Sequence, residues 1–539
     1  MSRPASLELP SPPAIDRGPS WRHPGLLVIF CMCLWLPGFF TLPPTDRDES
    51  RFAQATKQMI ETGDYVRIMN GTEPRNRKPI GIYWAQVPFA AAARATGIAR
   101  ANPIWPYRMP SLLGALLAVL AVALGGARLA SPRQAATAGA WFASSLVLIS
   151  EAHLAKTDAA LVGVTTLAMS LLARAFLTPE KMTRWQAASF WIAIAAGILL
   201  KGPITPMVVV LTVITLGVWT RRWSWLAVLR PWSGILLLLL LVVPWLVAIE
   251  IATKGAFFAQ SVGADLANKI SGGDDAHGEP FGTYLLLIPL LAFPAALPVL
   301  RALPAAWRDR TTDETRFLLA WLVPSWLVFE IVHTKLPHYT LPLYPALFLL
   351  AARLADLPVA RWWRAITLAL TLTAGLLLAA ALTAAPFLLH GAWWAGVPAA
   401  LAILIITGLA ASGRQNPALL IMPLAMVALF EIELPGLPAL AISPRLNTAL
   451  ASHNLSGLPF AVSGYDEPSL MFLAGTNEQW FRTGNQIGDW LAHTPHGVAL
   501  VENRNAAAFL KTDPRAIKID KVDGFDYSNG KQVSIGIYR

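Results

Sequence analysis

The chain has 539 residues, of which 55% are hydrophobic and only 14% are charged. Soluble domains carry about 25% charged residues, so this excess of apolar side chains excludes an ordinary soluble protein and predicts one that lies in the lipid bilayer. The formal net charge of +11 does not indicate nucleic acid, because the basic residues form short clusters between apolar runs, as loops beside anionic lipids do.

About thirteen apolar runs predict about thirteen membrane-spanning helices, each close to the roughly 20 residues that a bilayer requires. The first run, 25–40, follows a polar segment, 1–24. No small-residue cleavage site follows this run, so we expect an uncleaved helix and not a signal peptide. The other runs are 108–127, 134–152, 159–177, 186–200, 203–220, 228–251, 281–300, 316–333, 338–354, 363–387, 392–411 and 416–434.

Basic residues in alternate loops predict the orientation of these helices. Loops rich in Lys and Arg stay on the cytoplasmic side of a membrane. We therefore expect a cytoplasmic N-terminus and, after an odd number of spans, a C-terminus in the periplasm, with the protein in a bacterial inner membrane. The basic clusters are Arg3, Arg17 and Arg22; Arg128 and Arg133; Lys181 and Arg184; Arg221, Arg222 and Arg230; Arg301, Arg308 and Arg310; Arg361 and Arg364; and Arg414.

One outer loop, 43–107, departs from this pattern because it is also rich in Lys and Arg. Long loops are partly exempt from the charge rule, and the alternative is that these cations meet an anionic ligand; the charge pattern leaves both explanations open. Within the loop, 49–62 and 80–98 predict two interfacial helices. For the first we expect a cap at Asp48, a stop at Gly63, and a stripe of Phe52, Met59 and Ile60 at the membrane interface.

The composition changes near residue 439, where acidic residues become frequent. Short alternating apolar stretches, such as 498–501 and 533–538, predict strands of a small soluble α/β domain. The predicted organisation is a cytoplasmic tail at 1–24, a transmembrane domain at 25–438 that includes the periplasmic loop 43–107, and a periplasmic domain at 439–539. The expected fold class is an all-α polytopic membrane protein with this α/β domain attached.

The predicted topology gathers several charged residues at the outer ends of the spans. A carboxylate beside arginines can orient a hydroxyl or accept its proton, and cations beside aromatic rings suit a lipid phosphate. Helix capping, solvated ion pairs and aromatic membrane anchors are the simpler alternatives for each motif alone. Their convergence on one side favours a functional site. The gathered residues are Asp48, Lys78, Asp158, Lys201, Lys335 and His338.

Seven motifs occur in the order in which a known family carries them. The chain resembles the GT-C membrane glycosyltransferases related to the protein O-mannosyltransferases, and within them the 4-amino-4-deoxy-L-arabinose lipid A transferases. The resemblance extends over nearly the whole chain. The motifs are DESRFA at 48–53, TGDYVRIMNG at 62–71, RKPIGIYW at 77–84, KTDAAL at 156–161, KGPI at 201–204, KLPHYTLPLYPAL at 335–347 and EPSLMF at 467–472.

This resemblance implies a GT-C fold and a transferase whose donor is a sugar on a polyprenyl phosphate. The implied acceptor is lipid A or another envelope glycan, and neither a nucleotide sugar nor a cofactor is required. Asp48 would be the catalytic base or orient the acceptor, and Asp158 would shape the catalytic pocket. The implied contacts to the donor phosphate are Arg51, Lys78, Lys201, Lys335 and Tyr344. The implied lining of the substrate pocket is Glu49, Tyr83, His338 and Tyr339.

Two residues differ from the family pattern at positions that affect metal binding and substrate choice. Arg77 stands where the family often has a glutamate that can contact a metal, and Gln54 stands where a glutamate is common. A divalent metal is therefore possible but unsupported, and a different sugar or acceptor is plausible. In the outer loop 252–280, His277 lies near acidic residues, but the spacing matches no standard metal site. We expect a polar loop there, or a lid over the pocket.

The chemistry of such a donor explains why cations and carboxylates should meet. When the anomeric carbon loses its phosphate, negative charge grows on that phosphate, and fixed cations at a water-poor site stabilise it. A single displacement from the opposite face predicts inversion. The main alternative is a transporter or flippase of lipid-linked sugars, and a third is a scaffold for envelope assembly. Repeated halves and broken helices at the membrane midplane, which are frequent in transporters, are not evident in the sequence.

Overall fold

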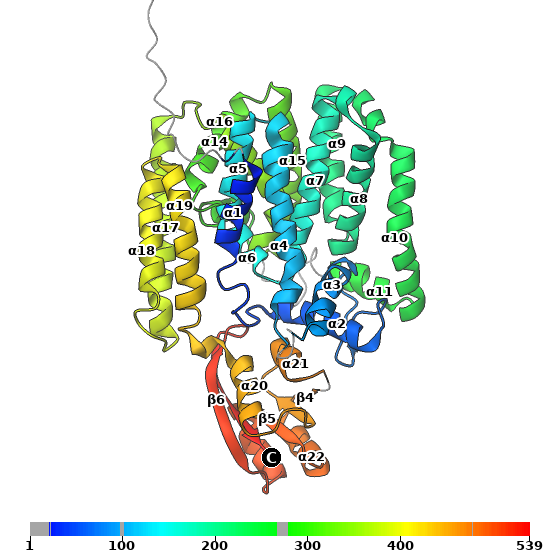
Figure 1. The fold of residues 1–539 in the computed structure, drawn as a ribbon, viewed down its shortest axis with the longest axis vertical. Coiled ribbons are helices and arrows are strands. Elements are labelled where there is room, and N and C mark those ends of the chain that lie inside the picture. The colour runs from blue at the N-terminus through cyan, green and yellow to red at the C-terminus, as the bar shows by residue number, and fades with distance from the viewer. Residues whose placement is uncertain (1–20, 22, 98–101, 267–278, 477) are drawn as a thin grey trace, which may run out of the picture.

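The computed structural model describes residues 21, 23–97, 102–266, 279–476 and 478–539. A body of helices, from α1 to η7 (residues 24–433), makes up most of the molecule, and a small domain with a β-sheet is attached to one end of it (Figure 1). The first helix of the body, α1 (Pro24–Trp35), leads into the loop that carries α2 (Arg47–Thr62), the short strands β1 (Met69–Asn70) and β2 (Glu73–Pro74), and α3 (Gly81–Ala95). These loop elements lie at the same end of the body as the small domain (Figure 1).

The rest of the body is a succession of helices. Five stretches of the described residues are long and apolar enough to cross a membrane. They are α4 with its continuation η1 and η2 (Trp105–Arg128), α7 (Asp158–Leu177), α10 (Pro231–Thr253), α17 (Arg361–Leu388), and α19 (Gln415–Val427) with its continuation η7, together Gln415–Glu433. The pair α5 (Pro132–Ser144) and α6 (Leu146–Ala152) makes a sixth if its bend of 63° is counted within one span.

The other predicted runs also contain helices, but these are shorter, broken or more polar. The twelve residues of α1 rise only about 18 Å, less than the roughly 30 Å of the hydrocarbon core. A multi-pass membrane protein is confirmed, whereas thirteen spans are not. These helices are α8 (Arg184–Lys201), α9 (Ile204–Thr220), α13 (Thr283–Leu291), α14 (Ala296–Arg308), α15 (Asp313–Ile331), α16 (Tyr344–Leu354) and α18 (Val397–Ala411). The short connecting turns include α11 (Ala256–Phe258) and η6 (Pro337–Leu343).

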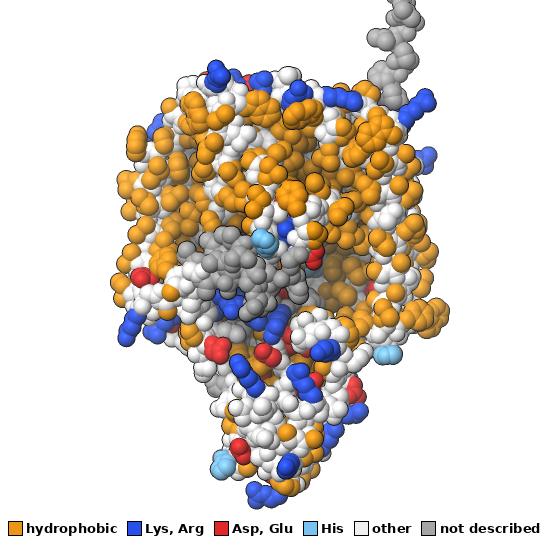
Figure 2. All heavy atoms as spheres, turned by 180° about the vertical axis from the view of Figure 1, so that it is seen from behind, with side chains coloured by type: hydrophobic (Ala, Val, Ile, Leu, Met, Phe, Trp, Pro, Cys, Tyr) orange, Lys and Arg blue, Asp and Glu red, His pale blue; other side chains and the backbone are white. Residues whose placement is uncertain are grey.

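The surface of the body matches a lipid environment. Large apolar side chains on α10 and α17 point outward, including Leu240, Ile251 and Leu377. Figure 2 shows hydrophobic side chains over most of the visible face of the body and Lys and Arg side chains along its edge remote from the small domain. Because exposed apolar side chains on this scale are unfavourable in water, the body is built for a membrane.

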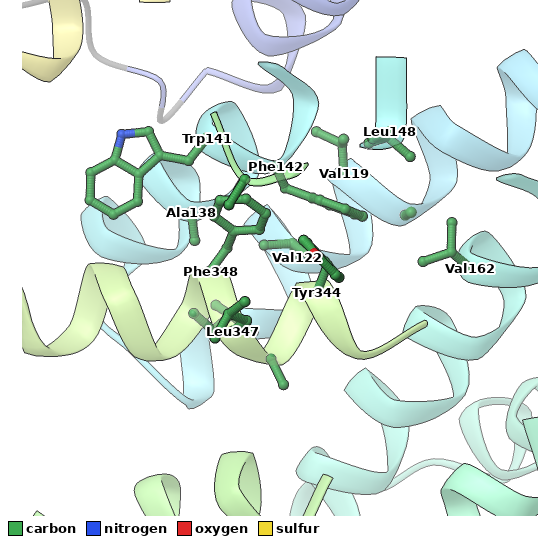
Figure 3. Close-up of a cluster of buried hydrophobic side chains, with 14 of the residues drawn as sticks. Val119, Val122, Ala138, Trp141, Phe142, Leu148, Val162, Tyr344, Leu347 and Phe348 are labelled. Carbon is green, nitrogen blue, oxygen red and sulfur yellow. The ribbon is translucent and has the colours of Figure 1, made fainter. Parts of the chain in front are cut away.

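The core of the body contains one residue that the sequence places elsewhere. Tyr344, at the start of α16, is fully buried, and its ring lies among the apolar side chains of α5 and α4 (Figure 3). The Phe348 ring lies 6.2 Å from it, and the Trp326 ring stacks on it at 6.4 Å. The predicted contact of Tyr344 with the donor phosphate is therefore not supported by its position, because packing in the core encloses its ring.

The small domain carries a mixed sheet of five strands in the order β4–β3–β5–β7–β6. Strand β3 (Phe460–Ser463) is parallel to β4 (Gln479–Phe481) and β5 (Val498–Glu502), whereas β7 (Lys531–Tyr538) is antiparallel to β5 and β6 (Lys518–Asp526). The α/β domain expected at the C-terminus is thus present. Its helices are α20 (Ile442–Ser452), α21 (Pro468–Ala474), α22 (Gly484–His493) and α23 (Asn503–Thr512).

Helix α2 starts earlier and packs differently from the expectation. Its N-cap is Asp46, whose carboxylate accepts hydrogen bonds from the backbone N–H groups of Asp48 (2.8 Å) and Glu49 (3.0 Å). The predicted cap at Asp48 is therefore wrong, and the side chain of Asp48 is not used as the cap. Gly63 ends the helix in the left-handed conformation, as expected.

The apolar stripe of α2 faces protein and not lipid. Phe52 and Met59 are buried in a cluster with residues of α3, α7 and α8, and the helix also contacts α21 of the C-terminal domain. An amphipathic helix needs an apolar surface to cover, and here the neighbouring helices provide it. The predicted position of the stripe at the membrane interface is therefore wrong, and α2 is held on two sides.

Candidate active site

Asp158, the first residue of α7, brings three segments together. Its Oδ1 lies 2.5 Å from Nζ of Lys201 at the end of α8, and its Oδ2 lies 3.9 Å from Nε2 of His338 in η6. The Lys201 ammonium lies 4.8 Å from the centroid of the Tyr339 ring. Four residues that the sequence assigned to the site therefore meet although they span 181 positions of the chain: Asp158, Lys201, His338 and Tyr339.

A chain of further charged groups extends from His338 to the start of α2. Nδ1 of His338 lies 3.5 Å from Oε1 of Glu151, and the same oxygen lies 3.3 Å from Nζ of Lys156. Lys156 in turn lies 3.6 Å from Oδ2 of Asp46, the N-cap of α2. Because Glu151 and Lys156 are both buried, these ion pairs are weakly screened and hold α2, α6 and η6 in one arrangement.

The protonation of this chain follows from its surroundings. His338 lies between two acidic side chains, Glu151 and Asp158, with one ring nitrogen toward each. Burial alone would lower the pKa of Lys156, but the carboxylates of Glu151 and Asp46 raise it above its ordinary value. Lys156 is therefore a fixed cation in this chain.

Asp48 lies in a second cluster on the first turn of α2. Its Oδ1 lies 3.3 Å from Nη1 of Arg51 and 3.5 Å from Nη2 of Arg75, and its side chain is 52% exposed. Burial would raise the pKa of Asp48, but the charges of Arg75, Arg51 and Lys156 together lower it below its ordinary value. Asp48 is thus an ionised carboxylate, open on one side, between cations. It can accept a hydrogen bond from an incoming hydroxyl.

The remaining basic residues assigned to the site lie around these clusters. Lys78 is partly buried in the turn before α3. Lys335 is buried, and its ammonium donates to the carbonyl oxygens of Val332 (2.9 Å) and Glu279 (3.0 Å). Lys335 therefore fixes the chain between α15 and η6, the segment that carries His338.

Glu49 and Tyr83 lie behind the site and not on its surface. Both oxygens of Glu49 are bound by Arg108, at 2.7 and 3.1 Å, and they also accept from the backbone N–H groups of Ala155 and Thr45. Neither the Glu49 nor the Arg108 side chain has more than 1% exposure, so the predicted contact of Glu49 with substrate is not supported. Tyr83 is also fully buried, and burial raises its pKa to about 12.

Four important residues were not assigned to the site from the sequence: Arg75, Arg108, Glu151 and Lys156. A signal existed for three of them. Lys156 opens the motif at 156–161, Glu151 lies inside an apolar run and Arg108 begins one, and ionisable residues at such positions are usually retained for function. Arg75 was one cation among many in the loop 43–107, and nothing in its neighbours distinguished it.

The described residues contain no group of three or more His, Cys, Asp or Glu side chains that could hold a metal ion. Asp274, Asp275 and His277, where a metal cluster or a lid was considered, lie outside the described residues. Arg77, at the position where a glutamate could contact a metal, is exposed.

Comparison with known sequences points to one group of enzymes. Residues 49–256 match the family described as dolichyl-phosphate-mannose-protein mannosyltransferase. The undecaprenyl phosphate-alpha-4-amino-4-deoxy-L-arabinose arabinosyl transferase 1 of Pseudomonas fluorescens is 27% identical over 347 residues, which are 62% of this chain and 60% of that protein. The chain thus matches about 60% of the length of this curated relative.

Comparison with solved structures decides the fold. The crystal structure of ArnT from Cupriavidus metallidurans bound to undecaprenyl phosphate superposes with a TM-score of 0.73 at 18% identity, covering 95% of this chain and 97% of that one. The chain has the GT-C fold. The apo form of the same protein gives a TM-score of 0.70 at 18% identity, with 95% and 96% coverage. The resemblance to the GT-C membrane glycosyltransferases that the motifs indicated is confirmed.

Proposed function

We propose that this protein transfers a sugar from a polyprenyl-phosphate donor to an envelope acceptor, such as lipid A or another glycan, at the periplasmic face of the inner membrane. One observation carries the proposal. In a GT-C fold, Asp48 with its arginines and Asp158 with Lys201 and His338 lie at the end of the helical body that bears the C-terminal domain. Two further facts support it: the curated relative is named as an arabinosyl transferase of undecaprenyl phosphate, and the superposed ArnT crystal contains undecaprenyl phosphate.

The proposed mechanism is a single displacement at the anomeric carbon. Asp48 accepts the hydrogen bond of the incoming hydroxyl, and its proton as the new carbon–oxygen bond forms. The bond to the phosphate breaks on the opposite face, and the charge that develops on the leaving polyprenyl phosphate is stabilised by the cations Arg51 and Lys78. The anomeric configuration is therefore inverted. The proposal requires no nucleotide or other cofactor.

The second cluster shapes the pocket. Asp158 holds Lys201 in position, and the imidazole of His338 with the ring of Tyr339 forms a wall that packs against the sugar and hydrogen-bonds to it. Lys335 acts through the segment that it holds. Such pre-arranged polar groups lower the barrier because they need no reorganisation during the reaction.

We further propose about thirteen spans, with residues 1–24 in the cytoplasm, the transmembrane domain at 25–438 and the domain at 439–539 in the periplasm. The apolar exterior of the body and the basic edge remote from the C-terminal domain support this orientation (Figure 2). Helices too short to span alone, such as α1 and α18, would complete their spans with the flanking segments and with locally thinner lipid.

Mass spectrometry of envelope lipids and glycans tests the proposal. Cells without the protein should lack one sugar substituent, and the wild-type gene should restore it. Asp48→Asn and Lys78→Ala should leave the protein inserted and folded but reduce transfer by about 100-fold or more. Arg67→Gln is a matched control, because Arg67 lies in the same loop and is 58% exposed. Full transfer by both site variants would refute the roles assigned to Asp48 and Lys78. A flippase or a scaffold would keep its function in both variants.

A further inference from the structure

Arg75, which no motif singled out, is an unusual cation within the site. Its side chain is only 11% exposed. Its Nε and Nη1 atoms are buried and have no hydrogen-bond partner within the part of the chain that the structure describes. Nη2, at the edge that faces Asp48, lies 3.5 Å from Oδ1 of that carboxylate. The backbone is fixed, since the N–H of Arg75 donates to the carbonyl oxygen of Ile68 at 2.8 Å.

A second unpartnered donor lies beside this guanidinium. Tyr83 is fully buried, its hydroxyl lies next to Arg75, and the oxygen has no hydrogen-bond partner among the described residues. The Phe52 ring supports both groups, since it lies 4.7 Å from the Arg75 guanidinium carbon and 5.5 Å from the Tyr83 ring. Two guanidinium nitrogens and one hydroxyl, none of which has a well-formed hydrogen bond among the described residues, are thus held together by packing.

Such an arrangement is unfavourable in the empty protein. A buried donor without an acceptor has lost its hydrogen bond to water and gained nothing in return, and the penalty is larger for a charged group. Native folds rarely retain such groups unless a ligand or an ion supplies the acceptor. The charge balance points the same way, because Asp48 is one carboxylate shared by two guanidinium groups, those of Arg51 and Arg75.

We propose that Arg75 and Tyr83 form a subsite for an oxyanion next to Asp48. The planar guanidinium fork matches the oxygen pairs of a phosphate or carboxylate, and the stacking on Phe52 holds its plane in place. The oxyanion enters at the Nη2 edge, beside the half-exposed Asp48 carboxylate, and the guanidinium turns its free nitrogens onto it. The ligand replaces Asp48 as the partner of Arg75, which frees that carboxylate for the incoming hydroxyl.

Two sources of this oxyanion exist if the proposed function holds, on which this subsite rests. One is the phosphate of the polyprenyl donor, and the other is a phosphate on the acceptor lipid. Both present the same chemistry to Arg75 and Tyr83. Separate binding experiments with the two lipids distinguish the two sources. Neither experiment requires that the sugar be known.

The test uses the full-length protein in detergent, with undecaprenyl phosphate and bis-phosphorylated lipid A as separate probes. Arg75→Met keeps the length of the side chain but removes its charge and donors, and Tyr83→Phe removes only the hydroxyl. We expect Arg75→Met to weaken binding of one lipid by about tenfold or more, and Tyr83→Phe to weaken the same one by about threefold. The Tm without ligand should not fall appreciably in either variant. Tyr83→Phe removes only an unpartnered hydroxyl, and Arg75→Met removes two unpartnered nitrogens and one long contact, at 3.5 Å, with the half-exposed Asp48 carboxylate.

The outcomes separate the subsite from the proposed function. A selective loss of undecaprenyl phosphate binding assigns the oxyanion to the donor, and a selective loss of lipid A binding assigns it to the acceptor. If both variants bind both lipids as the wild type does, or if Arg75→Met lowers the Tm without ligand while its affinities persist, the subsite is refuted and the proposed function stands. If the wild type binds neither lipid, the proposed function fails as well. Arg67→Gln serves as the control with unchanged affinities.

Discussion

Arg108 shows how much of the site's geometry depends on one buried side chain. At the start of α4, its guanidinium binds both oxygens of Glu49 and also donates to the carbonyl oxygens of Phe39 (3.2 Å), Leu42 (3.0 Å) and Pro43 (2.9 Å). One residue therefore joins the loop after α1 to the first turn of α2, where Asp48 lies. A buried ion pair contributes little by itself, but removing one partner leaves an uncompensated charge.

Arg108→Met should therefore destabilise the protein by about 3–5 kcal/mol, because the carboxylate of Glu49 remains buried without its cation. A fall in Tm in detergent measures this effect. The double variant Glu49→Leu/Arg108→Met removes both charges and should recover part of the loss. Equal Tm values for the wild type and the single variant would show that the pair is not structural.

At the same scale, the sequence identified Asp48, Asp158, Lys201, His338 and Tyr339. The structure brings the last four together, whereas Asp48 lies in a second cluster with Arg51 and Arg75. It could not assign Glu49 or Tyr344. Glu49 follows Asp48 directly in the chain, but successive residues of a helix point about 100° apart, so one faces the site and the other faces Arg108. Which groups the two side chains contact depends on the neighbouring helices.

At the scale of elements, α2 depends on the C-terminal domain. The ammonium of the buried Lys57 donates to the carbonyl oxygen of Phe472 in α21 at 3.0 Å, and Gln54 donates to the Thr476 hydroxyl at 3.1 Å. Phe472 is itself fully buried, and its ring lies 5.4 Å from that of Tyr107 in α4. The domain therefore holds α2 against the body and so helps to position Asp48.

Phe472→Ala should loosen this contact, because it removes a buried ring, a change that typically destabilises by about 3–5 kcal/mol. We expect faster proteolysis between the helical body and the C-terminal domain, near residue 440, and a loss of sugar transfer with the body still folded. Phe281→Ala is a matched control, since Phe281 is 67% exposed on the body. Unchanged proteolysis and transfer in Phe472→Ala would mean that the domain does not position α2.

The same contact predicts a dependence of stability on pH. Glu467, before α21, is almost fully buried, and burial raises its pKa from 4.5 to about 7. Between about pH 4.5 and pH 7, the folded protein keeps a proton on Glu467 that the unfolded chain releases. The contribution of this proton to the free energy of unfolding is therefore complete below about pH 4.5 and is lost as the pH rises through 7. Arg47, with Nε 3.6 Å from Glu467, offsets part of this loss.

Glu467→Gln should therefore flatten the decline of Tm between pH 5 and pH 8, because the amide does not titrate. The wild type should lose on the order of 3 kcal/mol over that range from this group. Thermal unfolding of both proteins in the same detergent measures the difference. Asp489→Asn, in an exposed position of α22, should leave the pH profile as it is. Parallel profiles of the wild type and Glu467→Gln would contradict the prediction.

At the scale of the whole molecule, orientation is the main expectation. The basic residues of alternate loops predict that the end opposite the C-terminal domain is cytoplasmic. Alkaline phosphatase becomes active only in the periplasm. A fusion of alkaline phosphatase after Arg539 should therefore be active in cells, whereas a fusion after Arg414, in a loop predicted to be cytoplasmic, should be inactive. The reverse pattern would place the proposed site on the wrong side of the membrane for an envelope acceptor.

The sequence by itself determined the class of environment, the resemblance to the GT-C membrane glycosyltransferases and the approximate limits of the helices. These properties depend on local composition and on motifs, as with the apolar runs, the stop at Gly63 and the change near residue 439. Only the tertiary structure decided that Arg108 meets Glu49, that Glu151 meets Lys156 and His338, and that Arg75 keeps two nitrogens without partners. The physical reason is that the protonation and the partners of an ionisable side chain depend on the groups around it in space. Packing brings those groups together from distant parts of the chain.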